Sequence, residues 1–227
     1  MKIVAYVPIK LNNTRTPGKN IKEFDDGTPL CNFIFNTLKQ VNGIDEIYCF
    51  CSDSKICDYL PNGVKFLQRD ECLDTPQTQS QDSGHAFIKS VPADVYVLCH
   101  ATSPFLKAMS IEKCIKAVLS KDYDSAFTGC SVRDFLWLDG KAINFNPENS
   151  VRTQELPPIY KETVGCYVFT PDVFERRNGK VGYKPYICEV GAIEAMDIDY
   201  PEDFIVCNAV YMQVLKDSYK DMEIAKP

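Results

Sequence analysis

Short apolar runs that alternate with helix-like segments constrain the fold of this chain more than any other feature. Residues 3–7 form an unbroken apolar run inside a predicted strand at 2–8. Further predicted strands lie at 46–51, 64–67, 95–99, 125–132, 165–170 and 193–199, and predicted helices at 29–41, 78–89, 110–119 and 201–215. Strands that alternate with helices indicate βαβ units. We therefore predict a Rossmann-like three-layer α/β/α fold with a mainly parallel sheet.

One segment, 134–161, breaks this alternation, and a structureless stretch of such length is unusual inside a compact domain. It nevertheless contains large apolar side chains: Phe135, Leu136, Trp137, Ile143, Phe145, Leu156, Ile159 and Tyr160. Exposed apolar surface marks a partner surface, and the commonest partner is an identical chain. We expect one domain spanning 1–227, in which 134–161 is a protruding arm that crosses to the second subunit of a homodimer. The alternative is an arm folded back onto its own sheet.

Composition narrows the functional classes. The net charge of −6 argues against a nucleic-acid binder. No apolar run approaches the roughly 18 residues that span a bilayer. We therefore expect neither a nucleic acid nor a membrane as a partner. The 11 cysteines lie mostly in apolar segments and form no CxxC pair. We interpret them as small core residues of a cytoplasmic protein, with a metal site at Cys49 and Cys51 as the less favoured alternative.

Positive charge gathers in the loop 10–20, directly after the first predicted strand. Lys10, Arg15 and Lys19 are its cations, and Gly18 would let the backbone approach a phosphate closely. Ligands of α/β sheets bind where such strands end. The loop therefore indicates either a site for a small polyanion or an ordinary solvated basic loop.

Two carboxylates stand two residues apart at Asp197 and Asp199. On a strand they would share one face, and two like charges side by side favour a cation between them. Oxygen ligands of this kind suit Mg²⁺, which also binds substrate phosphates. The alternative is an exposed strand end in which Asp199 caps the helix beginning at Pro201.

A hydroxyl-rich turn, His100-Ala101-Thr102-Ser103-Pro104, follows the predicted strand 95–99. Small polar turns at the carboxyl end of a strand build the pockets of α/β sheets. An ordinary turn with a structural His100 is the competing interpretation.

Together these stretches resemble the acylneuraminate (CMP-sialic acid) cytidylyltransferase family, over roughly residues 2–209. The motifs that carry the resemblance are Pro17-Gly18-Lys19-Asn20, the turn at 100–104, Asp197-Ile198-Asp199 with Asp203, Arg69, and Arg152-Thr153-Gln154 followed by Leu156-Pro157. The resemblance implies an enzyme that joins the CMP part of CTP to a small acidic acceptor and releases pyrophosphate. It also implies a dimer formed through an arm, with Arg152 or Lys161 near the acceptor site of the partner.

The resemblance further implies a set of site residues. Those expected to bind the nucleotide are Lys10, Asn12, Asn13, Arg15, Lys19, Asn20 and Arg69. Those expected to bind the acceptor are His100, Thr102, Ser103, Gln154, Tyr160 and Lys161. Asp197 and Asp199 would hold Mg²⁺, and we expect them to carry catalysis together with Lys10 and Lys19.

Several positions depart from the family pattern. Lys10 and Lys161 stand where the family has Arg, Asn13 replaces its Ser, and Leu106 replaces the Arg that usually ends the central turn. Lys cannot bind a carboxylate bidentately as Arg does. The acceptor is therefore left open between a sialic-acid-like 2-keto sugar acid and a phosphonate or other anionic alcohol, since Lys10, His100 and Lys161 would suit a compact dianion. A nucleotide-sugar glycosyltransferase and a non-enzymatic nucleotide-binding protein are the two competing functional classes.

Overall fold

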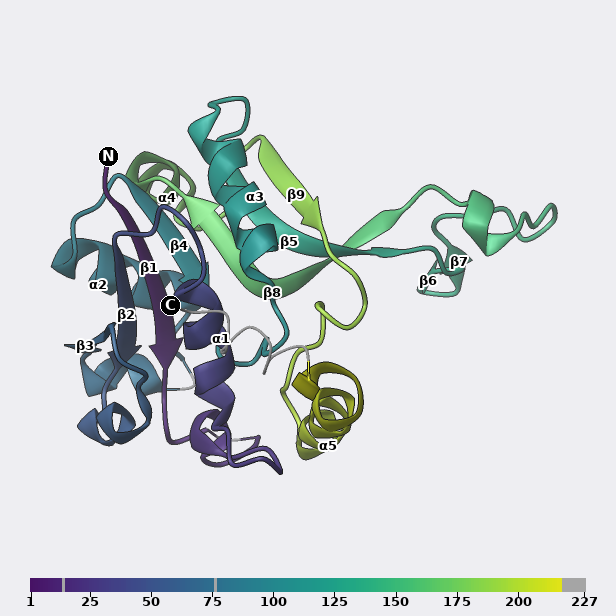
Figure 1. Cartoon of the computed structure of the whole chain (residues 1–227). Helices are drawn as coiled ribbons and strands as arrows, with labels where there is room; N and C mark the ends of the chain where they lie inside the picture. The colour runs from purple at the N-terminus through teal and green to yellow at the C-terminus, as the bar shows by residue number, and fades with distance from the viewer. Residues whose placement is uncertain (14, 76, 218–227) are drawn as a thin grey trace.

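The chain forms a seven-stranded sheet between two layers of helices, with an arm that projects from one side (Figure 1). The structure is a computed structural model, and it describes residues 1–13, 15–75 and 77–217. In order across the sheet the strands are β3 (Val64–Gln68), β2 (Glu46–Cys51), β1 (Ile3–Ile9), β4 (Val95–Cys99), β8 (Ile159–Phe169), β5 (Ser125–Val132) and β9 (Pro185–Glu189). Only β8 runs antiparallel to its neighbours in this sheet. The predicted α/β fold with a mainly parallel sheet is confirmed.

Both faces of the sheet are covered, which explains why β1 is apolar throughout. Ile3 and Val7 face one core cluster together with α1 (Leu30–Leu38) and α3 (Ala108–Leu119). Val4 and Tyr6 face the opposite cluster, which includes side chains of α2 (Ser80–Ser90) and α4 (Pro171–Arg177). A strand buried on both sides needs apolar residues at consecutive positions rather than at alternate ones.

The C-terminal helix α5 (Pro201–Val210) continues into a short π-helical segment, η5 (Tyr211–Leu215). Phe204 and Tyr211 pack against Phe24 and Phe33, with ring centroids 4.9 Å apart for Phe24–Phe204 and 4.8 Å apart for Phe33–Tyr211. This aromatic cluster fixes α5 beside the loop that follows β1. The residues just before α5 are thereby held close to that loop.

The predicted strand at 193–199 is wrong. Residues 192–195 form a turn, and 196–199 belong to no strand. The N–H of Ile198 donates to the carbonyl of Thr102 (2.9 Å), so this segment bonds to the turn after β4 rather than to a neighbouring strand. Two short elements, α4 and β9, were not predicted. A seven-residue helix and a strand that begins at Pro185 at the sheet edge leave little periodic signal.

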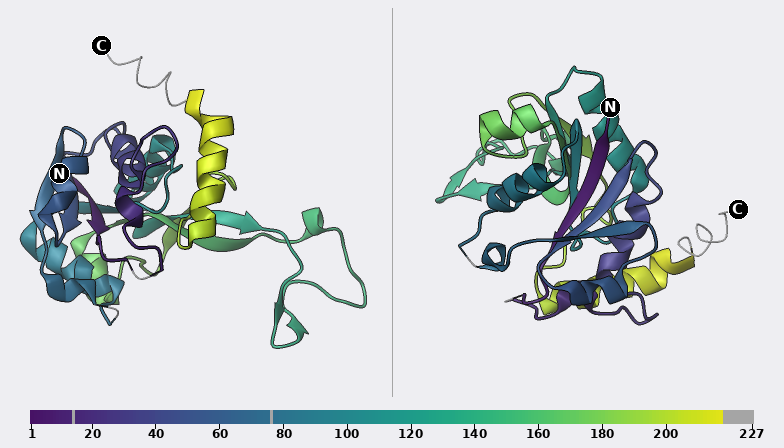
Figure 2. Two further views of the ribbon diagram at one scale, coloured as in Figure 1. Left: turned by 90° about the horizontal axis from the view of Figure 1, so that it is seen from below. Right: turned by 90° about the vertical axis from the view of Figure 1, so that its left-hand side faces the viewer.

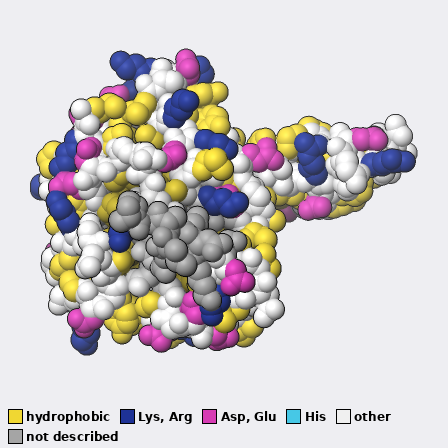
Figure 3. All heavy atoms as spheres, viewed as in Figure 1, with side chains coloured by type: hydrophobic (Ala, Val, Ile, Leu, Met, Phe, Trp, Pro, Cys, Tyr) yellow, Lys and Arg dark blue, Asp and Glu magenta, His cyan; other side chains and the backbone are white. Residues whose placement is uncertain are grey.

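The arm is the segment from 133 to 158, which connects β5 to β8 in sequence. It projects away from the sheet (Figures 1 and 2). It contains the short pair β6 (Trp137–Leu138) and β7 (Lys141–Ala142) and the single turn η4 (Thr153–Glu155). Hydrophobic side chains lie along it among charged ones (Figure 3). Trp137 is 58% exposed and Leu138 is 62% exposed. The arm is not folded back onto its own sheet.

All 11 cysteines are free thiols, and seven of the buried ones lie in the core cluster beneath α1 and α3. Among the helices that the structure describes, none combines the length and the apolar character needed to cross a bilayer.

Candidate functional site

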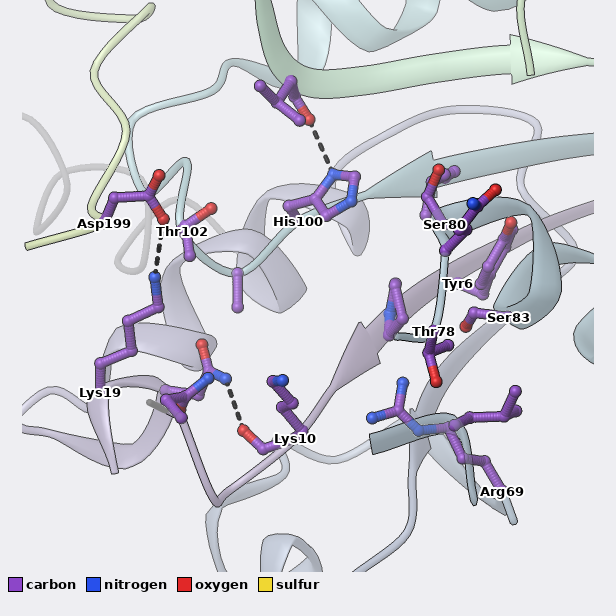
Figure 4. A pocket seen from close by; sticks show the side chains of 18 of the residues that line it. Tyr6, Lys10, Lys19, Arg69, Thr78, Ser80, Ser83, His100, Thr102 and Asp199 are labelled. Atoms are coloured by element: carbon purple, nitrogen blue, oxygen red, sulfur yellow. Dashed lines mark hydrogen bonds and ion pairs between the residues drawn. The ribbon is translucent and has the colours of Figure 1, made fainter. Parts of the chain in front are cut away.

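A cavity of about 390 Å³ opens at the carboxyl ends of β1 and β4. The chain runs from β1 outward through β2 and β3 before it returns to β4, so the direction of strand addition reverses between β1 and β4. Loops diverge at such a reversal and leave the crevice in which open α/β sheets bind ligands. Figure 4 shows the polar side chains that converge on this cavity from β1, from the loops after β1, β3 and β4, and from the segment before α5.

Cations reach the cavity from two sides. Lys10 and Lys19 come from the loop after β1, and Arg69 comes from the end of β3. Arg69 is buried, forms an ion pair with Asp74, and lies 5.9 Å from the ring centroid of Phe50. Because these contacts hold the guanidinium in one orientation, Arg69 presents a fixed planar donor to a ligand.

Asn20 braces the loop from inside. Its side chain is buried and donates through Nδ2 to the carbonyl of Lys10 (2.9 Å). Gly18 adopts a φ of 68°, in the left-handed region that side chains disfavour, and begins the single turn η1 (Lys19–Ile21). The turn at Gly18 therefore directs Lys19 inward rather than toward solvent.

Lys19 is buried, unlike a typical loop lysine. Its Nζ donates to the carbonyl of Ile198 (2.6 Å) and contacts Asp199 Oδ1 (3.2 Å). Thr16 Oγ1 donates to the carbonyl of Asp199 (3.1 Å), and Arg15 forms an ion pair with the Asp199 carboxylate at 2.6 Å. The basic loop is thus fastened to a segment about 180 residues away in sequence.

Asp197 and Asp199 differ in their surroundings. Burial raises the pKa of Asp197, and the charge of Asp199 adds to this effect, although a hydrogen bond from Thr102 opposes it. For Asp199, burial alone would raise the pKa, but the Lys19 ammonium and the Arg15 guanidinium outweigh it, so that the pKa lies below its ordinary value. Asp199 is therefore the firmly ionised member of the pair, while the protein neutralises the charge of Asp197 less completely.

Buried polar atoms without a partner gather at this cavity. Six such side-chain atoms occur among the residues that the structure describes, and five of them belong to residues that line the cavity. These five are Tyr6 Oη, Asn13 Oδ1, Arg69 Nε, Ser83 Oγ and Asp197 Oδ1. Native proteins pair nearly all of their buried polar groups, so this concentration indicates that a polar ligand completes the site.

A second hollow, of about 500 Å³, adjoins the same two carboxylates. Asp197 and Asp199 line both hollows, and Lys161, Tyr200 and Asp203 line the second one. Asp203 accepts hydrogen bonds from the backbone N–H groups of Asp199 and Tyr200, and so fixes the chain between the hollows. The carboxylate pair can therefore contact two different ligands at once.

The structure brings most of the predicted site residues together. The first cavity is lined by Lys10, Asn13, Lys19, Asn20, Arg69, His100, Thr102, Asp197 and Asp199, and the second hollow includes Lys161. Lys161 lines the same hollow as the two carboxylates of its own chain, and the expectation that Arg152 or Lys161 lies near the partner's acceptor site stays a prediction.

Five predicted residues lie elsewhere. Asn12 lines a separate surface hollow with Asp53 and Glu71. Arg15 lines neither of the two site hollows, but it pairs with Asp199 and lies 5.5 Å from the ring centroid of Tyr200. Ser103 is buried beneath Gly165 of β8, where an added Cβ would lie 3.5 Å from its Oγ. Gln154 lies in the arm, where its backbone carbonyl accepts from Arg133, and Tyr160 lies at the start of β8, where its hydroxyl donates to Glu189.

Sequence reasoning missed one wall of the cavity. It consists of Tyr6 and of side chains between β3 and the first turns of α2: Thr75, Thr78, Gln79, Ser80 and Ser83. The run of hydroxyl and amide side chains from 75 to 83 was the available signal. Most of these residues fall within the predicted helix at 78–89. Polar side chains are ordinary on the solvent-exposed face of a helix, so they did not indicate a binding site.

The carboxylate oxygens of Asp197 and Asp199 are the kind of ligand that a divalent metal ion such as Mg²⁺ prefers. Asp197 Oδ1 is buried without a hydrogen-bond partner, whereas the oxygens of Asp199 already contact Lys19 and Arg15. No group of three or more candidate protein ligands occurs among the described residues. Mg²⁺ commonly binds through one or two carboxylates and takes its remaining ligands from water and substrate phosphates.

Comparison with known proteins gives a family match. A model of the cytidylyltransferase family matches residues 4–204. A 3-deoxy-manno-octulosonate cytidylyltransferase of Hydrogenovibrio crunogenus is 24% identical over 129 residues, which cover 56% of this chain and 51% of that relative. This chain thus matches about half the length of that relative. A 3-deoxy-manno-octulosonate cytidylyltransferase of Acaryochloris marina is 22% identical over 240 residues, covering 90% of this chain and 95% of the relative.

Solved structures share the fold. A CMP:2-keto-3-deoxy-manno-octonic acid synthetase complexed with CTP superposes with a TM-score of 0.70 at 16% identity, covering 94% of this chain and 99% of the other. A 4-diphosphocytidyl-2C-methyl-D-erythritol synthase from Anaerococcus prevotii gives a TM-score of 0.65 at 14% identity, covering 93% and 96%. At these identities the likeness establishes the fold alone.

Proposed function

Because the chain belongs to the cytidylyltransferase family, we propose that it transfers CMP from CTP to a hydroxyl group of a 2-keto sugar acid and releases pyrophosphate. One observation carries the proposal beyond the family match. Asp197 and Asp199 line both the cavity at the sheet reversal and the second hollow. A nucleotide in the first and an acceptor in the second would meet at the carboxylate pair.

The first cavity suits CTP. Lys10 and Lys19 line the cavity, and their positive charges would neutralise a triphosphate bound beside them. Arg69 and Ser83 also line it, and they offer hydrogen-bond donors and acceptors for the nucleoside. Thr78 and Ser80 add hydroxyl groups on the same wall (Figure 4). The unpartnered polar atoms here would gain partners when the nucleotide binds, which favours a polar ligand over an apolar one.

In the proposed reaction the acceptor oxygen attacks the α-phosphorus in line, and pyrophosphate leaves on the opposite side. Lys10 and Lys19 orient the phosphates and neutralise the charge that develops on them, and the fastening of Lys19 to Ile198 keeps both parts of the site in register. Asp197 and Asp199 would hold Mg²⁺, which supplies further charge neutralisation at the phosphates when it is bound.

We propose 3-deoxy-manno-octulosonate, or a related 2-keto sugar acid, as the acceptor. The two relatives described above are named for this eight-carbon acid. Lys161 provides one cation for a carboxylate in the second hollow. A nine-carbon sialic acid and a phosphonate present similar anionic groups and are the competing acceptors.

Pyrophosphate release tests the proposal directly. The protein is incubated with Mg²⁺, CTP and one acceptor from a panel of 3-deoxy-manno-octulosonate, sialic acids and hydroxylated phosphonates, with ATP and UTP as nucleotide controls. We expect release with CTP and a 2-keto sugar acid, and a CMP-linked product of matching mass. Release only with a phosphonate would replace the acceptor, and release without CTP would overturn the proposed function.

A further inference from the structure

His100 is held in one tautomer by the backbone. Its Nδ1 lies 2.7 Å from the carbonyl oxygen of Val164, as the dashed line to His100 in Figure 4 shows. A carbonyl can only accept, so Nδ1 carries the proton and donates it. In a neutral ring the other nitrogen, Nε2, is then an acceptor, and in Figure 4 it points away from this carbonyl, toward the side on which Ser80 lies. Both residues line the cavity.

The sheet itself places this carbonyl. Pairing between β5 and β8 passes from Phe127 opposite Tyr167 to Gly129 opposite Glu162, so the intervening residues of β8 bulge out of register. Val164 lies in this bulge with a φ of 61°, a conformation that a β-branched residue rarely adopts. Bulges beside active sites commonly redirect a group toward the site, and here the group is the Val164 carbonyl.

The surroundings keep the ring uncharged. Burial, together with the nearby positive charge of Lys180, lowers the pKa of His100 to about 4. The Lys180 ammonium lies 3.7 Å from the ring centroid of Tyr167, and the Tyr167 hydroxyl donates to Glu162. The Tyr167 ring meets the His100 ring edge to face, with centroids 6.3 Å apart. Lys180 and His100 therefore both pack against the Tyr167 ring.

We propose that His100 is a specificity-determining residue that accepts a hydrogen bond from a substrate hydroxyl group through Nε2. This replaces the expectation from sequence that His100 helps bind a compact dianion, since a neutral ring with an outward lone pair repels an anion. The hydroxyl belongs either to the ribose of CTP or to the acceptor acid.

The tautomer can be tested without any substrate. The chain has two histidines, and His85 is on α2 with its Nε2 2.8 Å from Asn178 Oδ1, so a His85→Gln variant assigns the spectrum. Long-range ¹H–¹⁵N correlation at neutral pH should show a protonated Nδ1 and an unprotonated Nε2 for His100. A doubly protonated ring, or a proton on Nε2, would overturn the proposal.

The substrate part of this inference rests on the proposed function, and a cycle of variants and substrates tests it. Calorimetry measures the affinity of wild type and His100→Leu for CTP, 2′-deoxy-CTP, 3′-deoxy-CTP, 3-deoxy-manno-octulosonate and its deoxy analogues. We expect His100→Leu to weaken one of these ligands about tenfold, the scale of one hydrogen bond whose donor is left unpaired. Removing the matching hydroxyl should then cost the variant nothing further.

Two controls separate specificity from folding. His100→Gln retains an amide oxygen that can accept, and it should recover most of the lost affinity, whereas His85→Leu should change none of it. Equal losses for every ligand, or no coupling to any hydroxyl, would refute the role of His100 in substrate binding. Failure of turnover with every acceptor would refute the proposed acceptor class. The tautomer of His100 and its effect on CTP affinity would still be measured independently of turnover, and they would decide the role of His100.

Discussion

At the scale of single residues, Asp197 opposes the stability of the fold. Its pKa in the folded protein lies above the ordinary value, chiefly because of burial. The folded state therefore binds this proton more tightly than the unfolded state does. The resulting stabilisation is present below the unfolded pKa and is lost as the pH rises through the folded pKa. At neutral pH the ionised carboxylate costs free energy, as is common for groups kept for chemistry.

We accordingly predict that Asp197→Asn separates stability from activity. Turnover should fall by roughly a hundredfold or more, the scale on which removal of one preorganised charged group acts. In chelator-treated buffer at neutral pH the melting temperature should rise, and the gain should shrink as the pH is lowered toward the range in which Asp197 itself is protonated. Full activity of the variant, or a melting temperature below that of wild type at neutral pH, would contradict this account.

Lys19→Met should damage both folding and catalysis. The sequence left open an ordinary solvated basic loop, but Lys19 is buried and its ammonium bonds to Ile198 and Asp199. Loss of a buried charge-assisted hydrogen bond costs about 1.5–3 kcal/mol, so we expect a lower melting temperature together with slower turnover at saturating CTP. Lys39→Met, at the exposed end of α1, serves as the control and should alter neither.

At the scale of elements, α2 carries one wall of the cavity and rests on α4 through Gly84. A Cβ built at Gly84 would lie 2.3 Å from the ring of Phe174, so the two helices approach too closely for any side chain there. Gly84 thus sets the height of α2 above the sheet and, with it, the position of Ser80 and Ser83.

Gly84→Leu should therefore destabilise the fold even though leucine favours helix. Overpacking of this kind costs about 1–3 kcal/mol, which corresponds to a fall in melting temperature of roughly 2–12 °C for a chain of this size. Gly191→Leu is the matched control, because no heavy atom lies within 4 Å of a Cβ placed there. Thermal unfolding that is equal in the two variants would refute the tight contact between α2 and α4.

At the scale of the whole molecule, the arm carries large apolar side chains that its own chain leaves exposed. Trp137, Leu138 and Ile143 are each more than half exposed. Apolar surface of this kind in water is unfavourable by about 25 cal/mol per Å². The expectation of a homodimer formed through the arm therefore stands as a prediction, with Arg152, exposed on the arm, as the residue that can reach the partner's acceptor site.

Light scattering and subunit mixing test this assembly. A particle of one chain, 25.7 kDa, at micromolar concentration would exclude the dimer. If Arg152 acts in trans, mixing Asp199→Asn with Arg152→Ala subunits should restore activity, since one of the two sites then contains neither substitution. Mixing Asp199→Asn with Lys161→Ala should restore none beyond the two parents, because Lys161 and Asp199 line the same hollow of one chain. Recovery in the second mixture would contradict this placement of Lys161.

Much of the fold could be predicted from sequence because it depends on local patterns. The limits of β2, β4 and β5 agree with the predicted 46–51, 95–99 and 125–132. The same alternation of strands and helices predicted a mainly parallel sheet, because parallel strands are joined by crossover helices that cover the faces of the sheet. The basic loop and the two carboxylates likewise indicated a site for a phosphate ligand, because the charge of each side chain follows from its residue type alone.

Other features depend on contacts that no local pattern records. The burial of Lys19 and the failure of 193–199 to form a strand follow from how the segment before α5 bonds to the loops after β1 and β4. Ser103 is kept out of the cavity by its packing against Gly165 of β8. The tautomer of His100 depends on a bulge in β8, 64 residues away. The sequence determined the elements and the chemistry that they carry. The tertiary structure alone decided which polar groups are buried, paired or left to a ligand, because burial is a property of distant neighbours.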